Sequence, residues 1–246
     1  MFPLRDTAVC RRFPLAVVGL IALNALAFLY ELRVPPPRLD AFIASFGVIP
    51  ARFAHPQWAA AQGFPDDWRP LLTHMILHGG WAHLLGNLWM LKIFGDNVED
   101  RMGPLRFLAF YLLCGGAALA AHVGMDRDSV LPVVGASGAI AGVMGAYWAM
   151  FPRARVVVLV PVIVFPLLFE VPALLFLGFW FVSQIWSGSL AVASAAFEGG
   201  VAWWAHAGGF VAGLLLFPLF VRRDRWRRSD PGYVELRGTR RGWGRA

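Results

Sequence analysis

Long apolar segments recur along this chain and restrict it to a bundle of membrane-spanning helices. The first runs from Phe13 to Tyr30 and the last from Val201 to Val221. Inside a bilayer every backbone N–H and C=O must be paired within the protein, so an apolar segment of about 20 residues folds as a helix. Since 58% of the residues are hydrophobic and 15% are charged, we expect an integral membrane protein rather than a soluble domain.

We predict six spans packed as one domain, giving an all-α polytopic membrane protein. The spans are expected at residues 13–30, 84–94, 107–123 and 134–150, from Pro172 onward, and at 201–221. The second span is short for a bilayer. Prolines interrupt residues 156–172, which we interpret as an interfacial segment before the fifth span.

The remaining parts of the chain complete this layout. Residues 1–12 and 222–246 are expected to be a cytoplasmic amino-terminal segment and a basic cytoplasmic tail around the membrane domain of residues 13–221. From Glu31 to about Thr73 the chain is rich in Pro, Asp, Arg and Trp but keeps apolar residues. We expect this stretch to form a membrane-associated first loop.

Basic residues indicate the side that each connection occupies. They gather at the amino terminus, in the turns at 101–106 and 153–155, and in the tail. Because short cytoplasmic connections hold the Lys/Arg excess, both termini are predicted to be cytoplasmic, as in a bacterial inner-membrane protein. The net charge of +7 thus favours contact with membrane lipids and gives no indication of a nucleic-acid partner.

This topology places three polar side chains at one depth. His83, Ser137 and His206 fall near the outer ends of the second, fourth and sixth predicted spans. Polar and ionisable groups in a membrane are costly, so their presence indicates function. A serine hydroxyl becomes a nucleophile when a neutral histidine about 3 Å away accepts its proton. We therefore predict a dyad of Ser137 and His206.

Small residues beside the dyad predict close helix packing. Gly138 and Gly142 in the fourth span have GxxxG spacing, as do Gly209 and Gly213 in the sixth. This spacing lets two membrane helices approach backbone to backbone. Packing alone would also account for these glycines, but the serine and histidine beside them favour a catalytic site.

The second span supplies candidate oxyanion donors. His83 and Asn87 are four residues apart and share a helix face. Together with the Ser137 N–H they would stabilise the oxyanion of an acyl-transfer reaction. Either residue alone would more simply be an interhelical hydrogen-bonding group, whereas their combination with Ser137 and His206 favours catalysis.

Two other functions fit parts of the pattern. His74, His78 and His83 have spacing that could bind a metal, but no HExxH sequence or joining carboxylate accompanies them, so we expect no metal and no cofactor. Polar residues within the membrane and helices interrupted by proline also occur in transporters. The two halves of this chain, however, show no inverted repeat.

Four strings taken together resemble the rhomboid intramembrane serine proteases. They are WRPLLTHMILHGGWAHLLGN from Trp68, GDNVED with Glu99, GASGAIAG from Gly135, and AHAGGFVAG from Ala205. The resemblance extends from the first loop to the last span. It implies a six-helix rhomboid-like bundle and cleavage of peptide bonds in or next to the membrane segments of transmembrane protein substrates.

The resemblance also implies the role of each matching residue. Ser137 would be the nucleophile, and His206 the general base and then the general acid. His83 and Asn87 would support the oxyanion. In some relatives an aromatic residue one turn after the serine stacks on the histidine, whereas this chain has Ala141 there. The resemblance therefore leaves open what orients His206.

The remaining matches imply supporting roles. His78 and Gly135 would border the site, Trp68 and Arg69 would anchor the first loop at the membrane, and Glu99 would be a structural carboxylate on the cytoplasmic side.

The resemblance further suggests substrate access between the second and fifth spans, with residues 187–200 as a lid. A catalytically silent rhomboid-like protein that binds membrane clients is the main alternative. Such a protein would be expected to lack Ser137 or His206, and both are present.

Overall fold

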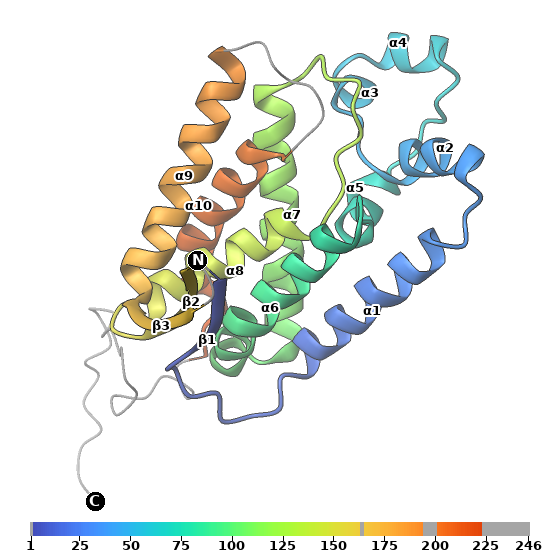
Figure 1. Ribbon diagram of the computed structural model, residues 1–246. Helices are drawn as coiled ribbons and strands as arrows, with labels where there is room; N and C mark the ends of the chain where they lie inside the picture. The colour runs from blue at the N-terminus through green and yellow to red at the C-terminus, as the bar shows by residue number, and fades with distance from the viewer. Residues whose placement is uncertain (1, 163–164, 194–200, 223–246) are drawn as a thin grey trace, which may run out of the picture.

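The computed structural model describes residues 2–162, 165–193 and 201–222, which form a helical bundle with a small sheet at one end (Figure 1). The bundle helices are α1 (Leu15–Glu31), α6 (Trp81–Met102), α7 (Pro104–Met125), α8 (Ser137–Met150), α9 (Ala173–Ala193) and α10 (Trp203–Phe220). Three of them, α7, α9 and α10, are long and apolar enough to cross a bilayer.

Helix α8 lies at the centre of the bundle. It contacts α6, α7, α9 and α10, and every residue from Gly138 to Tyr147 is buried. Glycine and alanine make up much of this helix, and their small side chains let four neighbours approach it at once. The site at its amino-terminal end is therefore held by the whole bundle.

Helices α8 and α10 form the closest pair. A Cβ atom on Gly209 would overlap the carbonyl of Gly138, and one on Gly213 would overlap the carbonyl of Gly142. The glycines with GxxxG spacing thus face each other across one interface. Backbone contact between the two helices fixes the separation of the side chains that they carry.

The first loop folds into short helices beside the bundle, at the right of Figure 1. They are α2 (Pro36–Phe46), α3 (Pro50–Ala54), α4 (Pro56–Ala61), α5 (Pro70–Thr73) and the 3₁₀ helix η1 (His74–Ile76). A proline stands in the first turn of each α-helix among them, where the missing N–H costs nothing. Prolines therefore mark the start of each short α-helix in the first loop.

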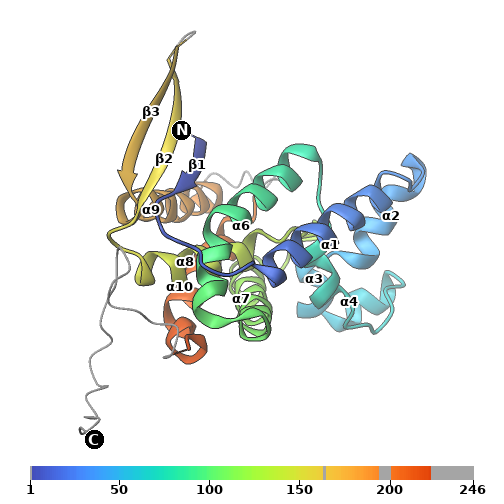
Figure 2. The same cartoon turned by 90° about the horizontal axis from the view of Figure 1, so that it is seen from below.

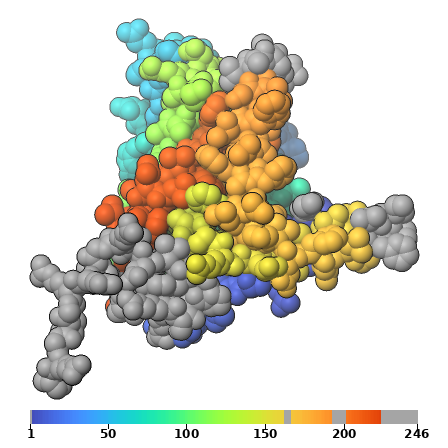
Figure 3. Space-filling model, turned by 90° about the vertical axis from the view of Figure 1, so that its left-hand side faces the viewer, coloured from blue at the N-terminus to red at the C-terminus, as the bar shows by residue number. Residues whose placement is uncertain are grey.

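The chain is mostly helical, as predicted, but a three-stranded antiparallel sheet forms where the amino terminus meets the connection between α8 and α9. Strand β1 (Phe2–Asp6) pairs with β2 (Arg155–Val162), which pairs with β3 (Phe165–Pro172). Figures 2 and 3 show this hairpin extending from the bundle beyond α9. The predicted interfacial segment is a hairpin because its β-branched residues favour strands, and Pro161 lies opposite Pro166 near its far end.

Two other boundaries differ from the prediction. The segment predicted as a short second span belongs to the 22-residue helix α6, which continues through the polar stretch from Asp96 to Met102. The predicted lid begins within α9, which extends to Ala193, while residues 194–200 lie outside the described part of the chain. A Cβ atom on Gly188 would lie 3.2 Å from side-chain atoms of Trp203 and Trp204, so this part of α9 packs closely against the start of α10.

Candidate active site

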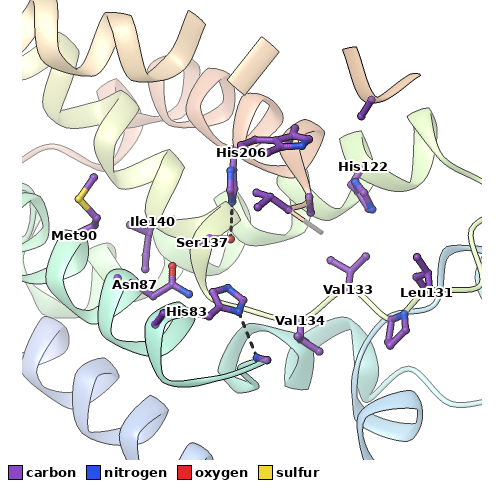
Figure 4. Close-up of a pocket in the computed structure, with 18 of the residues that line it drawn as sticks. His83, Asn87, Met90, His122, Leu131, Val133, Val134, Ser137, Ile140 and His206 are labelled. Carbon is purple, nitrogen blue, oxygen red and sulfur yellow. Dashed lines mark hydrogen bonds between the residues drawn. The ribbon is translucent and has the colours of Figure 1, made fainter. Parts of the chain in front are cut away.

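A pocket of about 770 Å³ lies among the amino-terminal ends of α6, α8 and α10 (Figure 4). His83 and Asn87 line it from α6, Ser137 from α8 and His206 from α10. Helix α7 adds His122, and α9 adds Trp180. Residues that are far apart in the sequence thus meet in one cavity.

Ser137 and His206 are in direct contact within this pocket. The Ser137 Oγ lies 2.8 Å from His206 Nε2, as the dashed line in Figure 4 marks. Ser137 is the first residue of α8, so its backbone N–H has no partner within the helix. His206 is 8% exposed. The geometry allows the hydroxyl proton to pass to the imidazole.

Gly135 makes the turn that presents Ser137. Its φ of +120° is one that residues with a side chain rarely adopt, and a Cβ atom there would lie 2.6 Å from His83 Nε2. Its N–H donates to the His74 carbonyl at 2.8 Å, and Val133 forms a β-bridge with Val48. The first loop therefore holds the segment that precedes the serine, a role that the sequence did not reveal.

His83 and Asn87 point from one face of α6 toward this turn (Figure 4). The Gly79 N–H donates to His83 Nδ1 at 3.4 Å, so a neutral His83 carries its proton on Nε2, the atom that faces Gly135. The Asn87 Nδ2 is buried and has no hydrogen-bond partner among the described residues. Two donors are thus available beside Ser137.

His78 lies behind His83 rather than on the pocket wall. The two rings are 5.1 Å apart in an edge-to-face arrangement, and the His78 N–H donates to the Glu31 carboxylate at 3.2 Å. Burial, with a smaller effect of His83, lowers the pKa of His78 to about 4. The His78 ring is therefore neutral at pH 7 and borders the site without adding charge to it.

The residues expected to be structural lie away from the pocket. The Glu99 carboxylate accepts hydrogen bonds from the N–H groups of Ala16 and Val17, at 3.0 and 2.8 Å, and so caps the first turn of α1. Trp68 is exposed, and Arg69 pairs with Asp67 at 2.8 Å. The described residues contain no group of His, Cys, Asp and Glu side chains arranged to bind a metal.

Side chains of α9 and α10 orient His206 where the sequence left its orientation open. The Gln184 Oε1 lies 2.7 Å from His206 Nδ1. The Trp180 and Trp203 rings lie 5.8 and 6.3 Å from the imidazole. Gln184 was not predicted, although a buried amide in an otherwise apolar span is a sequence signal of function.

Comparisons with known proteins agree with this architecture. The model of the Rhomboid domain matches residues 65–223, which is more than half of the chain and includes every residue of the pocket. The match begins at the end of the first loop and ends after α10.

Curated relatives show the same similarity. The chain is 36% identical over 86 residues to the putative rhomboid protease YdcA of Bacillus subtilis, covering 34% of this chain and 42% of that protein. It is 42% identical over 86 residues to the rhomboid protease GluP of B. subtilis, covering 35% and 16%. It is 25% identical over 176 residues to RHOMBOID-like protein 5 of Arabidopsis thaliana, covering 69% and 49%.

The chain therefore spans less than half the length of each of these three relatives. The similarity lies in the membrane bundle, since the family model covers α6 to α10. This match, together with the apolar helices of that bundle, makes the chain an integral membrane protein. It belongs to the rhomboid family.

Proposed function

We propose that this chain is an intramembrane serine endopeptidase that acts through Ser137 and His206. The observation that carries the proposal is the 2.8 Å contact between Ser137 Oγ and His206 Nε2 inside a pocket that also contains Asn87 Nδ2, a donor with no hydrogen-bond partner in the described part of the chain. The reaction is acyl transfer from a peptide bond of a transmembrane substrate to the serine and then to water.

The first half of the reaction forms an acyl-enzyme. Ser137 Oγ attacks the scissile carbonyl carbon while His206 Nε2 accepts the hydroxyl proton. The carbonyl oxygen becomes an oxyanion, which the Ser137 N–H, Asn87 Nδ2 and His83 Nε2 stabilise. His206 then protonates the leaving amine as the C–N bond breaks.

The second half regenerates the enzyme. Water replaces the departed amine, and His206 Nε2 accepts a proton from it as its oxygen attacks the ester carbon. The C–Oγ bond breaks, the proton returns to Ser137, and the new carboxyl end leaves. No cofactor enters either half of the reaction.

The bundle supports access from the membrane plane. Helix α8 has 14 residues, which span about 21 Å and so less than the roughly 30 Å of hydrocarbon. We therefore place Ser137 below the outer surface, within six spans whose termini face the cytoplasm of a bacterial cell. Helices α6 and α9 have no extensive contact within the described ranges, and a substrate segment would approach between them.

Substitution of the dyad tests the proposal. Ser137→Ala and His206→Ala are each expected to reduce cleavage of a model transmembrane substrate in detergent by at least about a thousandfold. A fluorophosphonate probe should label the wild-type protein at Ser137 and should not label His206→Ala.

Controls come from the same residue types outside the pocket. Ser45→Ala and His55→Ala change exposed side chains of the first loop and should retain wild-type activity. Persistent cleavage in Ser137→Ala would overturn the proposal. A folded wild-type protein that neither cleaves nor takes the probe would instead indicate a client-binding protein.

A further inference from the structure

The imidazole of His206 has two nitrogen atoms with different neighbours. Nε2 faces Ser137 Oγ at 2.8 Å, and Nδ1 faces Gln184 Oε1 at 2.7 Å. A neutral imidazole carries one proton, so only one nitrogen can accept the serine proton at a time. The neighbour of Nδ1 therefore decides whether His206 can act as a base.

The amide of Gln184 is oriented by its own helix. The Ser183 hydroxyl donates to the Trp180 carbonyl at 2.6 Å, so its oxygen remains available as an acceptor. Gln184 Nε2 donates to that oxygen at 3.1 Å and approaches the Trp180 carbonyl at 3.3 Å. A flipped amide would place its carbonyl oxygen against the Trp180 carbonyl, which also only accepts.

This orientation determines the tautomer of His206. Since Gln184 Oε1 only accepts, His206 Nδ1 must hold the proton, and Nε2 is left with its lone pair toward Ser137. Gln184 is 5% exposed, so its amide has little contact with solvent that could compete for the bond. An uncharged acceptor also avoids burying a carboxylate in the bundle.

We propose that Gln184 is a positioning residue that holds His206 in the tautomer able to accept the Ser137 proton. The inference rests on the proposed protease function for its effect on rate, but the tautomer can be measured without activity. Trp180 and Trp203 restrict tilting of the ring, whereas Gln184 fixes which nitrogen is protonated.

Gln184→Met tests this assignment, because methionine has a similar length and no strong acceptor. It should lower kcat for a transmembrane substrate roughly ten- to a hundredfold and leave KM within about twofold, since one hydrogen bond that acts through the base is lost. In ¹⁵N spectra of labelled histidine, the His206 signals should move from the Nδ1–H tautomer toward Nε2–H.

Gln184→Glu provides the second variant. It keeps an acceptor at Nδ1 and adds a charge that stabilises the imidazolium, so activity should persist while the acidic limb of the kcat–pH profile moves to higher pH. The other ionisable side chains that line this pocket are His83, His122 and Asp126. In the described part of the chain the Gln184 amide is hydrogen-bonded to His206 and to none of these three, so we assign the movement of the limb to His206.

Val182→Met is the matched control, because it introduces the same side chain at an exposed position of α9 and should change neither kcat nor the spectrum. Wild-type kcat and an unchanged Nδ1–H tautomer in folded Gln184→Met would overturn the proposal. An inactive wild-type protein that still shows the tautomer change would refute the protease function and keep the role of Gln184.

Discussion

At the scale of single residues, the proposed active site depends on Gly135 as well as on Ser137 and His206. Its positive φ turns the chain so that Ser137 begins α8, and its missing Cβ leaves room for His83 Nε2. The Asn87 amide lies beside the same turn. A side chain at position 135 would therefore occupy the space where we expect the oxyanion to form.

Gly135→Ala should lower kcat by at least about a hundredfold, because the added methyl displaces His83 and strains the turn. Cleavage of a transmembrane substrate by the folded variant gives the measurement. Gly63→Ala is the matched control, since Gly63 also has a positive φ but nothing lies near its missing Cβ. It should cost roughly 1 kcal/mol of stability and leave kcat unchanged. Wild-type activity in Gly135→Ala would contradict this account of the turn.

At the scale of secondary-structure elements, strand β1 is attached to the bundle by the half-buried carboxylate of Asp6. Asp6 accepts hydrogen bonds from the Tyr147 hydroxyl and from Asn97 Nδ2. The Trp89 indole N–H donates to the Pro3 carbonyl. Burial raises the pKa of Asp6 to about 6, although the Tyr147 hydrogen bond opposes the shift. The strand thus binds most tightly when Asp6 is protonated.

The pH dependence of stability follows from this shift. In the unfolded chain Asp6 ionises near the ordinary aspartate pKa of 3.8, whereas in the folded protein its pKa is raised to about 6. The contribution of Asp6 to the free energy of unfolding is fully present below about pH 4 and is lost as the pH rises through about 6. The melting temperature in detergent should therefore decrease as the pH is raised from 4.5 to 7. The corresponding loss in the free energy of unfolding is roughly 1–3 kcal/mol.

Asp6→Asn should reduce the slope of this dependence, because the amide keeps an acceptor for Tyr147 without ionising. Asp40→Asn, in the first loop, is the control and should leave the slope as in the wild type. A slope in Asp6→Asn equal to that of the wild type would contradict the assignment to Asp6.

At the scale of the whole molecule, the two ends of the bundle differ in charge and structure. The sheet and the turn at residues 152–154 lie at one end, while residues 126–131 connect α7 to the site at the other (Figure 1). Basic residues gather at the sheet end. The distribution favours a sheet in the cytoplasm and a pocket near the outer surface.

Cysteine labelling in intact bacterial cells tests this orientation. In a Cys10→Ser background, Asp128→Cys should react with a membrane-impermeant maleimide from outside, because Asp128 is exposed at the pocket end. Arg153→Cys, which replaces an exposed residue near the sheet, should react only after the cells are permeabilised. The opposite pattern would reverse the topology and place the pocket on the cytoplasmic side.

The sequence alone determined the apolar helices of the bundle and four of the side chains that line its pocket, namely His83, Asn87, Ser137 and His206. Apolar length predicts helices because a bilayer leaves no other partner for backbone groups. Glycine spacing indicated the close pair α8 and α10 because a missing Cβ is visible in the sequence itself. The family resemblance could also be recognised from the sequence, because the residues around Ser137 and His206 form short contiguous motifs.

Only the tertiary structure decided which residues surround the motifs of Ser137 and His206. The contact of Gln184 with His206, the hydrogen bond from Gly135 to His74, and the pairing of β1 with β2 each join segments distant in the sequence. No local periodicity encodes such partners, because they depend on how helices rotate and pack. The residues able to react were therefore readable from the chain, whereas the groups that orient them became visible only in the folded bundle.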